Sequence, residues 1–320
     1  MMASTLALQV ALPLALLLWL ALMPARNLLG LLLQVMGIGT FLLALALVAQ
    51  WALPAWWLPR LYGALWLAIV AGLVFRRERP ARGWLPSGIP GWAGLAISAG
   101  LVALGSWYSA RALTAQVPPA PVVDIASPFG PGHYLVGHGG SDLLVNAHLK
   151  TLDSTEARYR PWRGQSYALD FFAIGPWGFR ASSWQPPDPA EYAIFDARLH
   201  APCAGLVVSA DSQKPDHTVP QQDLVDRLGN YVILRCNNGT ADIVLAHMRQ
   251  GSLAVQPGEV VQTGDYLGQV GNSGASTEPH LHIHAQRPAP EGQPLISGEP
   301  LALRIEGRFL IRNDHLLATE

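Results

Sequence analysis

The sequence predicts an N-terminal α-helical membrane anchor of four transmembrane helices, followed by a C-terminal all-β domain of mostly antiparallel sheet. Half of the 320 residues are apolar, and the long apolar runs all lie before residue 112. Beyond residue 125 the pattern changes to short β-branched or alternating runs separated by Gly, Pro and Asn, which is typical of strands joined by turns. We found no helical period long enough to compete with this interpretation.

Four apolar segments fill the N-terminal region, and each approaches the length of about 20 residues that a helix needs to cross a bilayer. They are residues 6–23, 28–51, 56–75 and 91–108. Tryptophans lie near their ends, as expected at a membrane–water interface. No charged or strongly polar residue was identified in the middle of a span, so we expect a passive anchor rather than an ion or proton pathway.

Charge separates the two parts of the chain and orients the first. Residues 1–112 hold seven arginines, one acidic residue and no lysine, a net charge of +6, whereas the remaining 14 basic and 21 acidic residues give −7. Four arginines lie within residues 76–82 and Arg26 lies in the other loop on that side, against Arg60 alone in the opposite loop. Arginine-rich loops face the cytoplasm, so both termini are predicted to lie outside. The acidic C-terminal part lacks the clustered positive surface of a nucleic-acid-binding protein.

The predicted domains are residues 1–112, a Pro-rich linker at 113–124, and residues 125–320. Pro118, Pro119 and Pro121 favour an extended spacer in the linker. Two polar insertions, at about 149–164 and 211–228, interrupt the β domain, and insertions of this length usually serve a function or are mobile. The expected strands are 134–136, 167–174, 205–209, 231–235, 243–247, 266–270, 280–285 and 308–311.

The two cysteines, Cys203 and Cys236, both lie in the acidic part of the chain. They are either two buried thiols or, in an extracytoplasmic domain, a disulfide between neighbouring strands. Neither belongs to a CxxC pair, so a cysteine-based zinc site is not expected.

The segment that ends in HLHIH, residues 280–284, contains the most distinctive chemistry. His280 and His282 are one residue apart in an expected strand, so they point to the same face, about 6–7 Å apart. Such a pair suits one zinc ligand beside one proton-transferring or hydrogen-bonding histidine. The alternative is a histidine-rich edge strand that faces solvent.

Several motifs occur in a fixed order over most of residues 125–290. They are APCAG at 201–205, GNYV at 229–232, LAHM at 245–248, PGE and TGD at 257–259 and 263–265, and GNSG followed by PHLH at 271–282. As an ordered set they resemble the lysostaphin/LytM-type zinc metallopeptidases, a family that cuts peptides of bacterial peptidoglycan. The resemblance implies the duplicated-hybrid-like β fold of that family and one Zn²⁺ per domain.

The family motif HxxxD…HxH implies which residues hold the metal. Its carboxylate matches Asp170, and its last histidine matches His282. Four residues before Asp170 stands Ser166, where the family has histidine. His148, in an Asn-x-His element similar to one in some members, is the expected replacement. Other upstream histidines are the alternatives, His138 and His133.

The remaining histidines divide between the site and its surroundings. By resemblance, His247 and His280 are the catalytic residues that transfer protons and stabilise the transition state. His247 follows Ile243 and Leu245 with a period of two, which places it on their buried face. His284 stands where many relatives carry glutamate and points the same way as His280 and His282, which is compatible with a contact behind the ligands, and no role is assigned to it. Three others are expected in exposed loops or termini, His200, His217 and His315.

The resemblance and the topology together imply a multi-pass protein of the bacterial cytoplasmic (inner) membrane. Its extracytoplasmic domain would be a zinc endopeptidase that hydrolyses peptide bonds of peptidoglycan stem or cross-bridge peptides. Its partners would be peptidoglycan, the lipid bilayer and candidate cell-wall proteins. Two alternatives remain. One is a catalytically inactive LytM-type domain that binds or activates a partner cell-wall hydrolase, which Ser166 favours. The other is a membrane sensor with an apolar ligand pocket.

Overall fold

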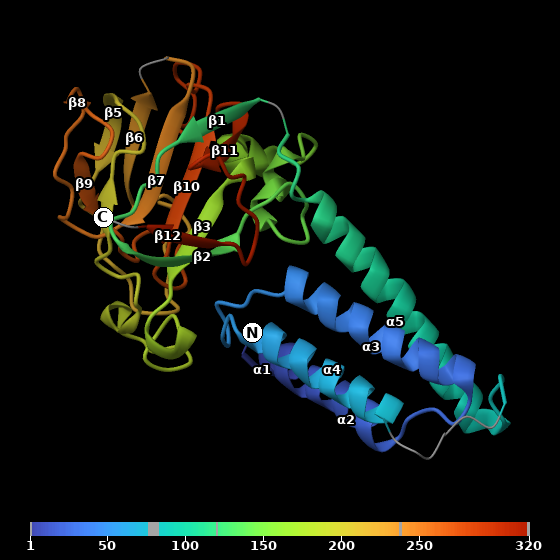
Figure 1. Cartoon of the computed structure of the whole chain (residues 1–320). Helices are drawn as coiled ribbons and strands as arrows, with labels where there is room; N and C mark the ends of the chain where they lie inside the picture. Colours follow the sequence, from blue (N-terminus) through green and yellow to red (C-terminus); the bar gives the residue numbers. More distant parts are fainter. Residues whose placement is uncertain (1, 76–82, 120, 237–238, 319–320) are drawn as a thin grey trace. The chain divides into compact units, whose positions relative to one another are not determined.

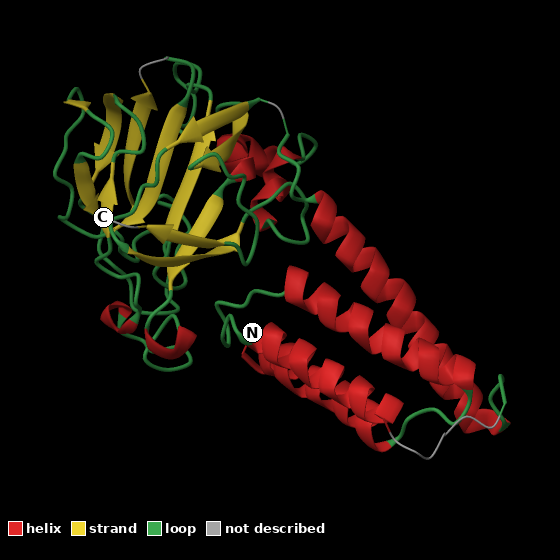
Figure 2. Cartoon of the chain, viewed as in Figure 1, coloured by secondary structure: helices red, strands yellow, loops and turns green. Residues whose placement is uncertain are grey.

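The computed structural model of the chain describes residues 2–75, 83–119, 121–236 and 239–318. The chain divides into two compact units, Met1–Leu113 and Thr114–Glu320. The first unit is helical and the second is built on strands (Figures 1 and 2). The predicted combination of a helical region and an antiparallel sheet domain is confirmed.

The N-terminal unit contains four helices that are long and apolar enough to cross a membrane: Ser4–Leu22, Leu28–Val48, Leu58–Phe75 and Gly88–Thr114. The first combines α1 (Met2–Leu6), a π-helical turn η1 (Ala7–Ala11) and α2 (Leu12–Leu22). The others are α3 (Leu28–Val48), α4 (Leu58–Phe75) and α5 (Gly88–Thr114). The arginine-rich loop at 76–82 lies outside the described residues.

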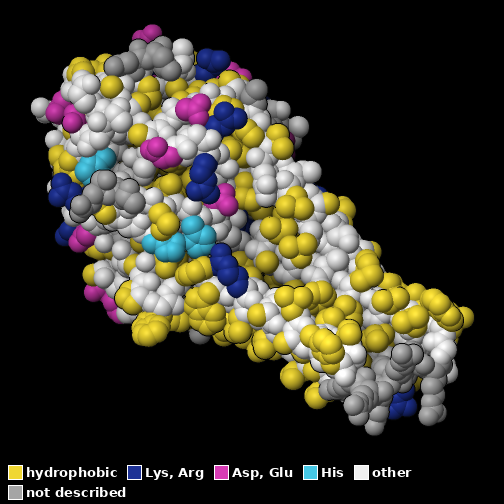
Figure 3. All heavy atoms as spheres, in the orientation of Figure 1, with side chains coloured by type: hydrophobic (Ala, Val, Ile, Leu, Met, Phe, Trp, Pro, Cys, Tyr) yellow, Lys and Arg dark blue, Asp and Glu magenta, His cyan; other side chains and the backbone are white. Residues whose placement is uncertain are grey.

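On the face that Figure 3 shows, many apolar side chains, in yellow, lie on the surface of this unit. Leu67 and Val74 are 61% and 74% exposed, which would be unfavourable in water but suits a lipid environment. A smaller buried cluster, which includes Leu20, Ile38 and Trp51, joins the helices.

Two glutamines, Gln9 and Gln34, lie buried in these helices, each in the first half of its span. Gln9 falls in the π-helical turn, where a backbone carbonyl is free to bond outside the helix. The Tyr62 hydroxyl donates to this Gln9 carbonyl at 2.8 Å. Gln34 is 1% exposed in α3, and it bonds only to the backbone of the preceding loop.

The predicted linker spans the junction between α5, which ends at Thr114, and β1, which begins at Val122. The Ser141 hydroxyl lies within hydrogen-bonding distance of the carbonyls of Ala115 and Val117, at 3.1 and 2.8 Å. Ala120, in the middle of the linker, lies outside the described residues. The domain boundaries at 112 and 125 stay a prediction.

The C-terminal unit contains twelve named strands among its described residues. They are β1 (Val122–Ile125), β2 (Gly132–His138), β3 (Leu169–Ala173), β4 (Arg198–His200), β5 (Gly205–Asp211), β6 (Asn230–Cys236), β7 (Asp242–Met248), β8 (Val260–Val261), β9 (Tyr266–Gln269), β10 (Leu281–Gln286), β11 (Pro300–Ile305) and β12 (His315–Ala318). Four 3₁₀ segments accompany them, η2 (Ala147–Leu152), η3 (Ala157–Tyr167), η4 (Pro176–Gly178) and η5 (Pro189–Glu191).

A ten-stranded sheet forms the body of this unit, in the order β12-β2-β3-β10-β7-β6-β5-β8, with β11 paired to β10 and β1. Strands β4 and β9 form a separate pair. Among the described strands every pairing is antiparallel except β1 with β11, so the predicted mostly antiparallel sheet is confirmed.

One face of the large sheet packs into the main hydrophobic core. Phe171 of β3, Leu245 of β7 and Ile283 of β10 lie in this core together with Leu199 of β4 and Leu267 of β9. Because side chains alternate along a strand, the neighbours of these residues face the opposite side of the sheet. The candidate site residues lie on that opposite face.

Several strands differ from the expectation. Residues 308–311 form no strand: Arg308 makes only an isolated bridge with Ile305, and residues 315–318 pair with β2 instead. The strand expected from 280 begins at Leu281. Cys203 and Cys236 form a disulfide, the second of the two alternatives.

Candidate metal centre

A pair of facing residues on β3 and β10 forms the base of the site. Asp170 and His282 are directly opposite each other in the antiparallel register. Side chains of such pairs lie close together on one face, and His282 Nδ1 is 3.0 Å from Asp170 Oδ1. Both residues are buried. Two predicted ligands, 112 positions apart in the sequence, therefore meet because the sheet aligns them.

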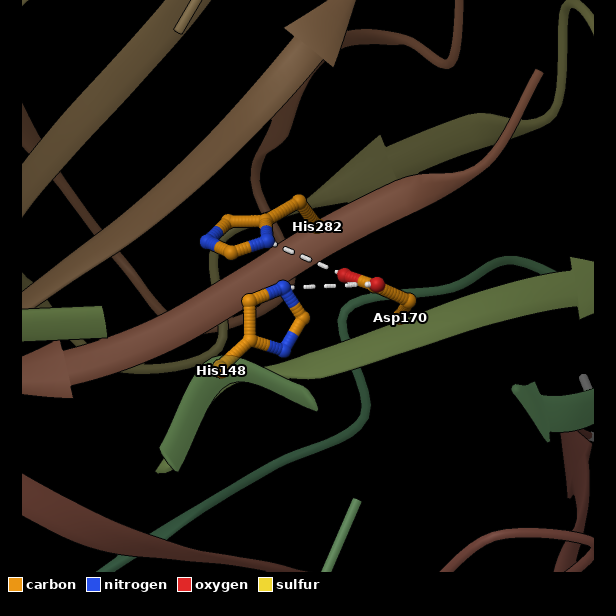
Figure 4. A group of neighbouring side chains, drawn as sticks. All are labelled: His148, Asp170 and His282. Carbon is orange, nitrogen blue, oxygen red and sulfur yellow. Dashed lines mark hydrogen bonds and ion pairs between the residues drawn. The ribbon is translucent and has the colours of Figure 1, made fainter. Parts of the chain in front are cut away.

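His148 joins this pair from η2. Its Nε2 is 3.5 Å from Asp170 Oδ2, and Figure 4 shows the three side chains converging. One candidate ligand atom from each of His148, Asp170 and His282 lies within 4.8 Å of the others. The structure thus brings together the three residues that the sequence predicted as metal ligands.

Asn146 fixes the orientation of His148. Its side-chain oxygen lies 3.1 Å from the His148 backbone N–H and 3.0 Å from His148 Nδ1. Its amide group donates to the carbonyls of Gly140 and Ala168, both at 3.1 Å. The oxygen can only accept, so Nδ1 carries the hydrogen and the Nε2 lone pair faces Asp170. The Asn-x-His motif drew attention to this segment, but the supporting role of Asn146 was not predicted.

Ser166, which stands where the family motif has its first ligand histidine, makes hydrogen bonds within its own segment and to Thr151. It lies in η3, where its hydroxyl donates to the Arg163 carbonyl at 2.6 Å and lies 2.8 Å from Thr151 Oγ1. Of the two alternative ligands, His138 lies beside the group, with its ring centroid 5.6 Å from that of His148. His133 instead contacts His315 on the neighbouring strand.

His247 reaches the site through a β-bulge. Tyr231 pairs with Ala246 and Asn230 with Met248, so His247 is the extra residue in β7, and its φ is +61°. A bulge of this kind interrupts the alternation of side chains. The prediction that His247 shares the buried face of Ile243 and Leu245 is therefore wrong, because Met248 occupies the core instead.

The ring of His247 lies among the other site histidines. Its centroid is 4.7 Å from that of His280 and 5.7 Å from that of His282. Its Nδ1 is 2.9 Å from the Ser273 carbonyl, which can only accept a hydrogen bond. The N–H is thus on Nδ1, and Nε2 is left as the proton-accepting atom.

His280 has a similar arrangement just before β10. Its Nδ1 is 2.9 Å from the Glu278 carbonyl and 3.1 Å from Ser276 Oγ, while its Nε2 is 3.8 Å from Asp170 Oδ1. The carbonyl again places the hydrogen on Nδ1. His247 and His280 therefore both present an unprotonated Nε2 to the site.

His284 lies behind the ligands on the same face of β10. Its Nδ1 is 3.0 Å from His282 Nε2, which is the kind of contact that its position in the sequence allowed. It is fully buried, and its Nε2 has no hydrogen-bond partner among the described residues.

Burial and mutual contact keep the site in the protonation state that metals require. Burial lowers the pKa of His148 to about 3 and holds the pKa values of His247 and His284 well below the ordinary histidine value. For Asp170 burial alone would raise the pKa, but the surrounding imidazoles outweigh it and hold the pKa well below its ordinary value. At neutral pH His148, His247 and His284 are therefore neutral, and Asp170 is ionised.

The insertion at 211–228 makes backbone hydrogen bonds to the loop between β9 and β10. The backbone N–H groups of His217 and Asp223 donate to the carbonyls of Asn272 and Gly274. On the other side, Arg180 pairs with Glu278 at 2.7 Å. The insertion at 211–228 thus frames the site. His200 and His315, expected in exposed loops or termini, lie instead half-buried in β4 and β12, and His217 is also half-buried.

The donor set fits zinc. Two neutral imidazoles and one carboxylate leave a fourth position for water or substrate, as in catalytic zinc sites. Donor atoms around a tetrahedral zinc with bonds of about 2.0–2.1 Å lie about 3.3–3.4 Å apart. His282 Nδ1 lies 3.0 Å from Asp170 Oδ1 and His148 Nε2 lies 3.5 Å from Asp170 Oδ2, so both imidazoles lie close to the carboxylate that would hold the ion.

Residues 193–295 match the family model for Peptidase family M23. The C-terminal domain is of the M23, lysostaphin/LytM type. The matched segment of the M23 domain contains His247, His280 and His282 but begins after His148 and Asp170. The first two ligands are therefore supported by their positions in space and not by the family model.

Solved structures of related proteins also resemble the chain. A solution structure of lysostaphin is 21% identical, covering 39% of this chain and 38% of its own, with a TM-score of 0.26. The catalytic domain of lysostaphin from Staphylococcus simulans is 19% identical over 52% and 82% of the two chains, with a TM-score of 0.27. A zinc-containing peptidase from Vibrio cholerae is 18% identical over 37% and 46%, with a TM-score of 0.23.

Some of these chains extend well beyond the M23 domain: the protein spans only about two fifths of the first lysostaphin structure. We infer no activity from likeness at this level. No curated protein matches the chain.

Proposed function

We propose that the protein is a membrane-anchored zinc endopeptidase that hydrolyses peptide bonds in peptidoglycan stem or cross-bridge peptides. One observation supports this most strongly. The convergent group of His148, Asp170 and His282 lies beside His247 and His280 in an M23 domain. A metal site with two adjacent proton acceptors has the parts that peptide hydrolysis requires.

The chemistry divides between the metal and the chain. When bound, zinc lowers the pKa of water and polarises the scissile carbonyl. His280 Nε2 accepts the proton of the attacking water and returns it to the leaving amine. The Glu278 carbonyl stabilises the protonated His280 ring, because its Nδ1–H continues to donate there. His247 lies at the bulge of β7, where its Nδ1–H donates to the Ser273 carbonyl. From there it assists His280 in the reaction.

The proposed location is the extracytoplasmic side of the bacterial cytoplasmic membrane. The arginine distribution supports it through the positive-inside rule. The Cys203–Cys236 disulfide supports it independently, since disulfides persist in oxidising compartments. Peptidoglycan lies on that side of the membrane, so the substrate and the site would share a compartment.

Digestion of purified peptidoglycan tests the activity. The unit Thr114–Glu320 has its own hydrophobic core, so we would use it with zinc, with a chelator, and as the His280→Ala variant. We expect zinc-dependent release of peptides, identified by mass spectrometry, that the other two samples lack. A domain that binds one zinc but releases no fragment would support the rival function, activation of a partner hydrolase.

The assignment of the first ligand has its own test. His148→Ala should abolish zinc binding as completely as His282→Ala, because each removes one of three ligands. Ser166→Ala and His138→Ala serve as controls and should retain one zinc per domain, measured by elemental analysis. Retention of zinc by His148→Ala, or its loss from His138→Ala, would show that the first ligand is another residue.

A further inference from the structure

A cavity of about 910 Å³ lies inside the helical unit, where α2 ends and where α3 and α5 begin. Residues from all three helices and from the α2–α3 connection line it. Pockets that bind organic ligands have volumes of about 300–1,000 Å³, and the volume of this cavity falls in that range. A simple ion needs far less space. A passive anchor does not require such a space.

Part of the wall is buried and polar. Asn27 and Gln34 line the cavity and are 8% and 1% exposed. Gln34 uses both of its polar atoms on the backbone of the preceding loop. Asn27 uses only its oxygen, which accepts the Gly30 N–H at 2.7 Å. Its amide group donates no hydrogen bond within the part of the chain that the structure describes, so an unpaired donor is available at the wall.

Arg26 gives this wall a positive charge. Among the described residues of the helical unit there is no acidic side chain to neutralise it, since Glu78 lies outside them. The arginines at the other end of the spans are arranged differently. Arg60 and Arg111 lie over tryptophan rings, at 4.5 and 5.1 Å, whereas Arg26 lines the cavity.

Another part of the wall is apolar. Trp19 at the end of α2 and the leucines Leu73, Leu85 and Leu95 line it. Tryptophan near a helix end is typical of the membrane–water interface. A cation and a free amide donor thus lie next to a surface that suits hydrocarbon.

We propose that this cavity binds the phosphate group of an anionic membrane lipid. Arg26 pairs with the phosphate, the Asn27 amide donates to it, and the lipid chain lies against Trp19 and the leucines. Guanidinium–phosphate pairs are strong, charge-assisted contacts. Basic pockets between transmembrane helices are a recognised kind of lipid site.

The test uses the full chain in detergent, stripped of lipid and titrated with phosphatidylglycerol under native mass spectrometry. The expected result is retained phosphatidylglycerol, with phosphatidylcholine bound more weakly. Arg26→Gln should weaken phosphatidylglycerol binding about tenfold or more, because it removes a charged partner of a hydrogen bond. Arg60→Gln is the matched control, with the same loss of charge at the other end, and should leave the affinity unchanged.

A second pair of variants closes the cavity without altering charge. A Cβ on Gly94, which lines the cavity, has Trp19 Cζ2 as its nearest neighbour at 4.0 Å, and one on Gly100 has nothing within 4 Å. Gly94→Leu should therefore fold and lose lipid binding, while Gly100→Leu on the same helix should keep it.

Two results would overturn the proposal. Equal weakening by Arg26→Gln and Arg60→Gln would mean that general surface charge attracts the lipid. Displacement of the lipid by inorganic phosphate at a similar concentration would mean that the site recognises a free anion.

Discussion

Two side chains that ligate no metal, Asn146 and His284, decide how the ligand histidines are presented. Asn146 fixes the tautomer of His148, and His284 lies against the far nitrogen of His282. Ligand histidines normally donate their second N–H to an acceptor, and loss of that acceptor weakens metal binding. His284 takes the acceptor's place here.

Replacement of His284 tests this role. His284→Gln retains an acceptor and should preserve zinc affinity, whereas His284→Leu should lower it by roughly 10- to 100-fold. Competition with a chromophoric chelator measures the affinity directly, without an activity assay. Equal affinities in the two variants would contradict the role, and the melting temperatures of both serve as the folding control.

His138 should make the metal-free domain sensitive to acid. Burial lowers its pKa to about 4, against about 6.5 in an unfolded chain. Between these two pKa values the unfolded chain binds a proton that the folded domain does not bind. The free energy of unfolding therefore falls as the pH falls. The contribution of His138 between pH 7 and 5 is on the order of 1–2 kcal/mol.

Urea unfolding of the chelator-treated domain at pH 7 and pH 5 measures this effect. The variant His138→Gln should lose less stability on acidification than the wild type. His200→Gln, in β4, is the control. Identical losses in the wild type and His138→Gln would rule out this source of acid sensitivity.

For single residues, the sequence predicted which side chains come together in the site but not the backbone geometry that brings them together. Asp170, His282 and His148 were identified from motifs, whereas no role was assigned to His284. The face of His247 was predicted wrongly, because strict alternation cannot reveal a bulge that depends on the pairing of β6 with β7.

The disulfide between Cys203 and Cys236 cross-links the segment just before β5 to the end of β6. Cys203 and Cys236 are 33 residues apart, and a cross-link over a loop of that length stabilises a protein by about 3–4 kcal/mol in the chain-entropy account. We expect the double variant Cys203→Ser/Cys236→Ser to lose about this much stability in denaturant unfolding. Zinc content should be unaffected, since neither cysteine lies near the ligands. An unchanged unfolding midpoint would contradict the expectation.

Two physical causes explain most of the strands that the sequence missed. Strands β4 and β8 are three and two residues long, too short for a period of two to be visible. Strands β1 and β11 depend on pairing with each other across most of the domain. The longer strands β5, β6, β7 and β10 were all predicted within a few residues, and β7 and β10 are buried throughout.

For the whole molecule, the four apolar helices and the antiparallel domain followed directly from composition and turn signals. The orientation in the membrane is testable with single cysteines in intact and lysed cells. Gln293→Cys, on an exposed loop of the C-terminal unit, should react with a membrane-impermeant maleimide in intact spheroplasts. Ala81→Cys, in the arginine-rich segment, should react only after lysis. The reverse pattern would invert the proposed topology.

The cross-strand position of Asp170 and His282 gives the metal a mechanical consequence. These residues are 112 positions apart, and β10 is bonded to both β3 and β7. A bound ion would close one large ring of chain between Asp170 and His282, and His148 would close a smaller one next to it, ending at Asp170. Loss of zinc would open both rings at once, so the metal-free domain should exchange the amide hydrogens of β3, which carries a ligand, faster than those of β5 and β6, which carry none and lie further along the sheet.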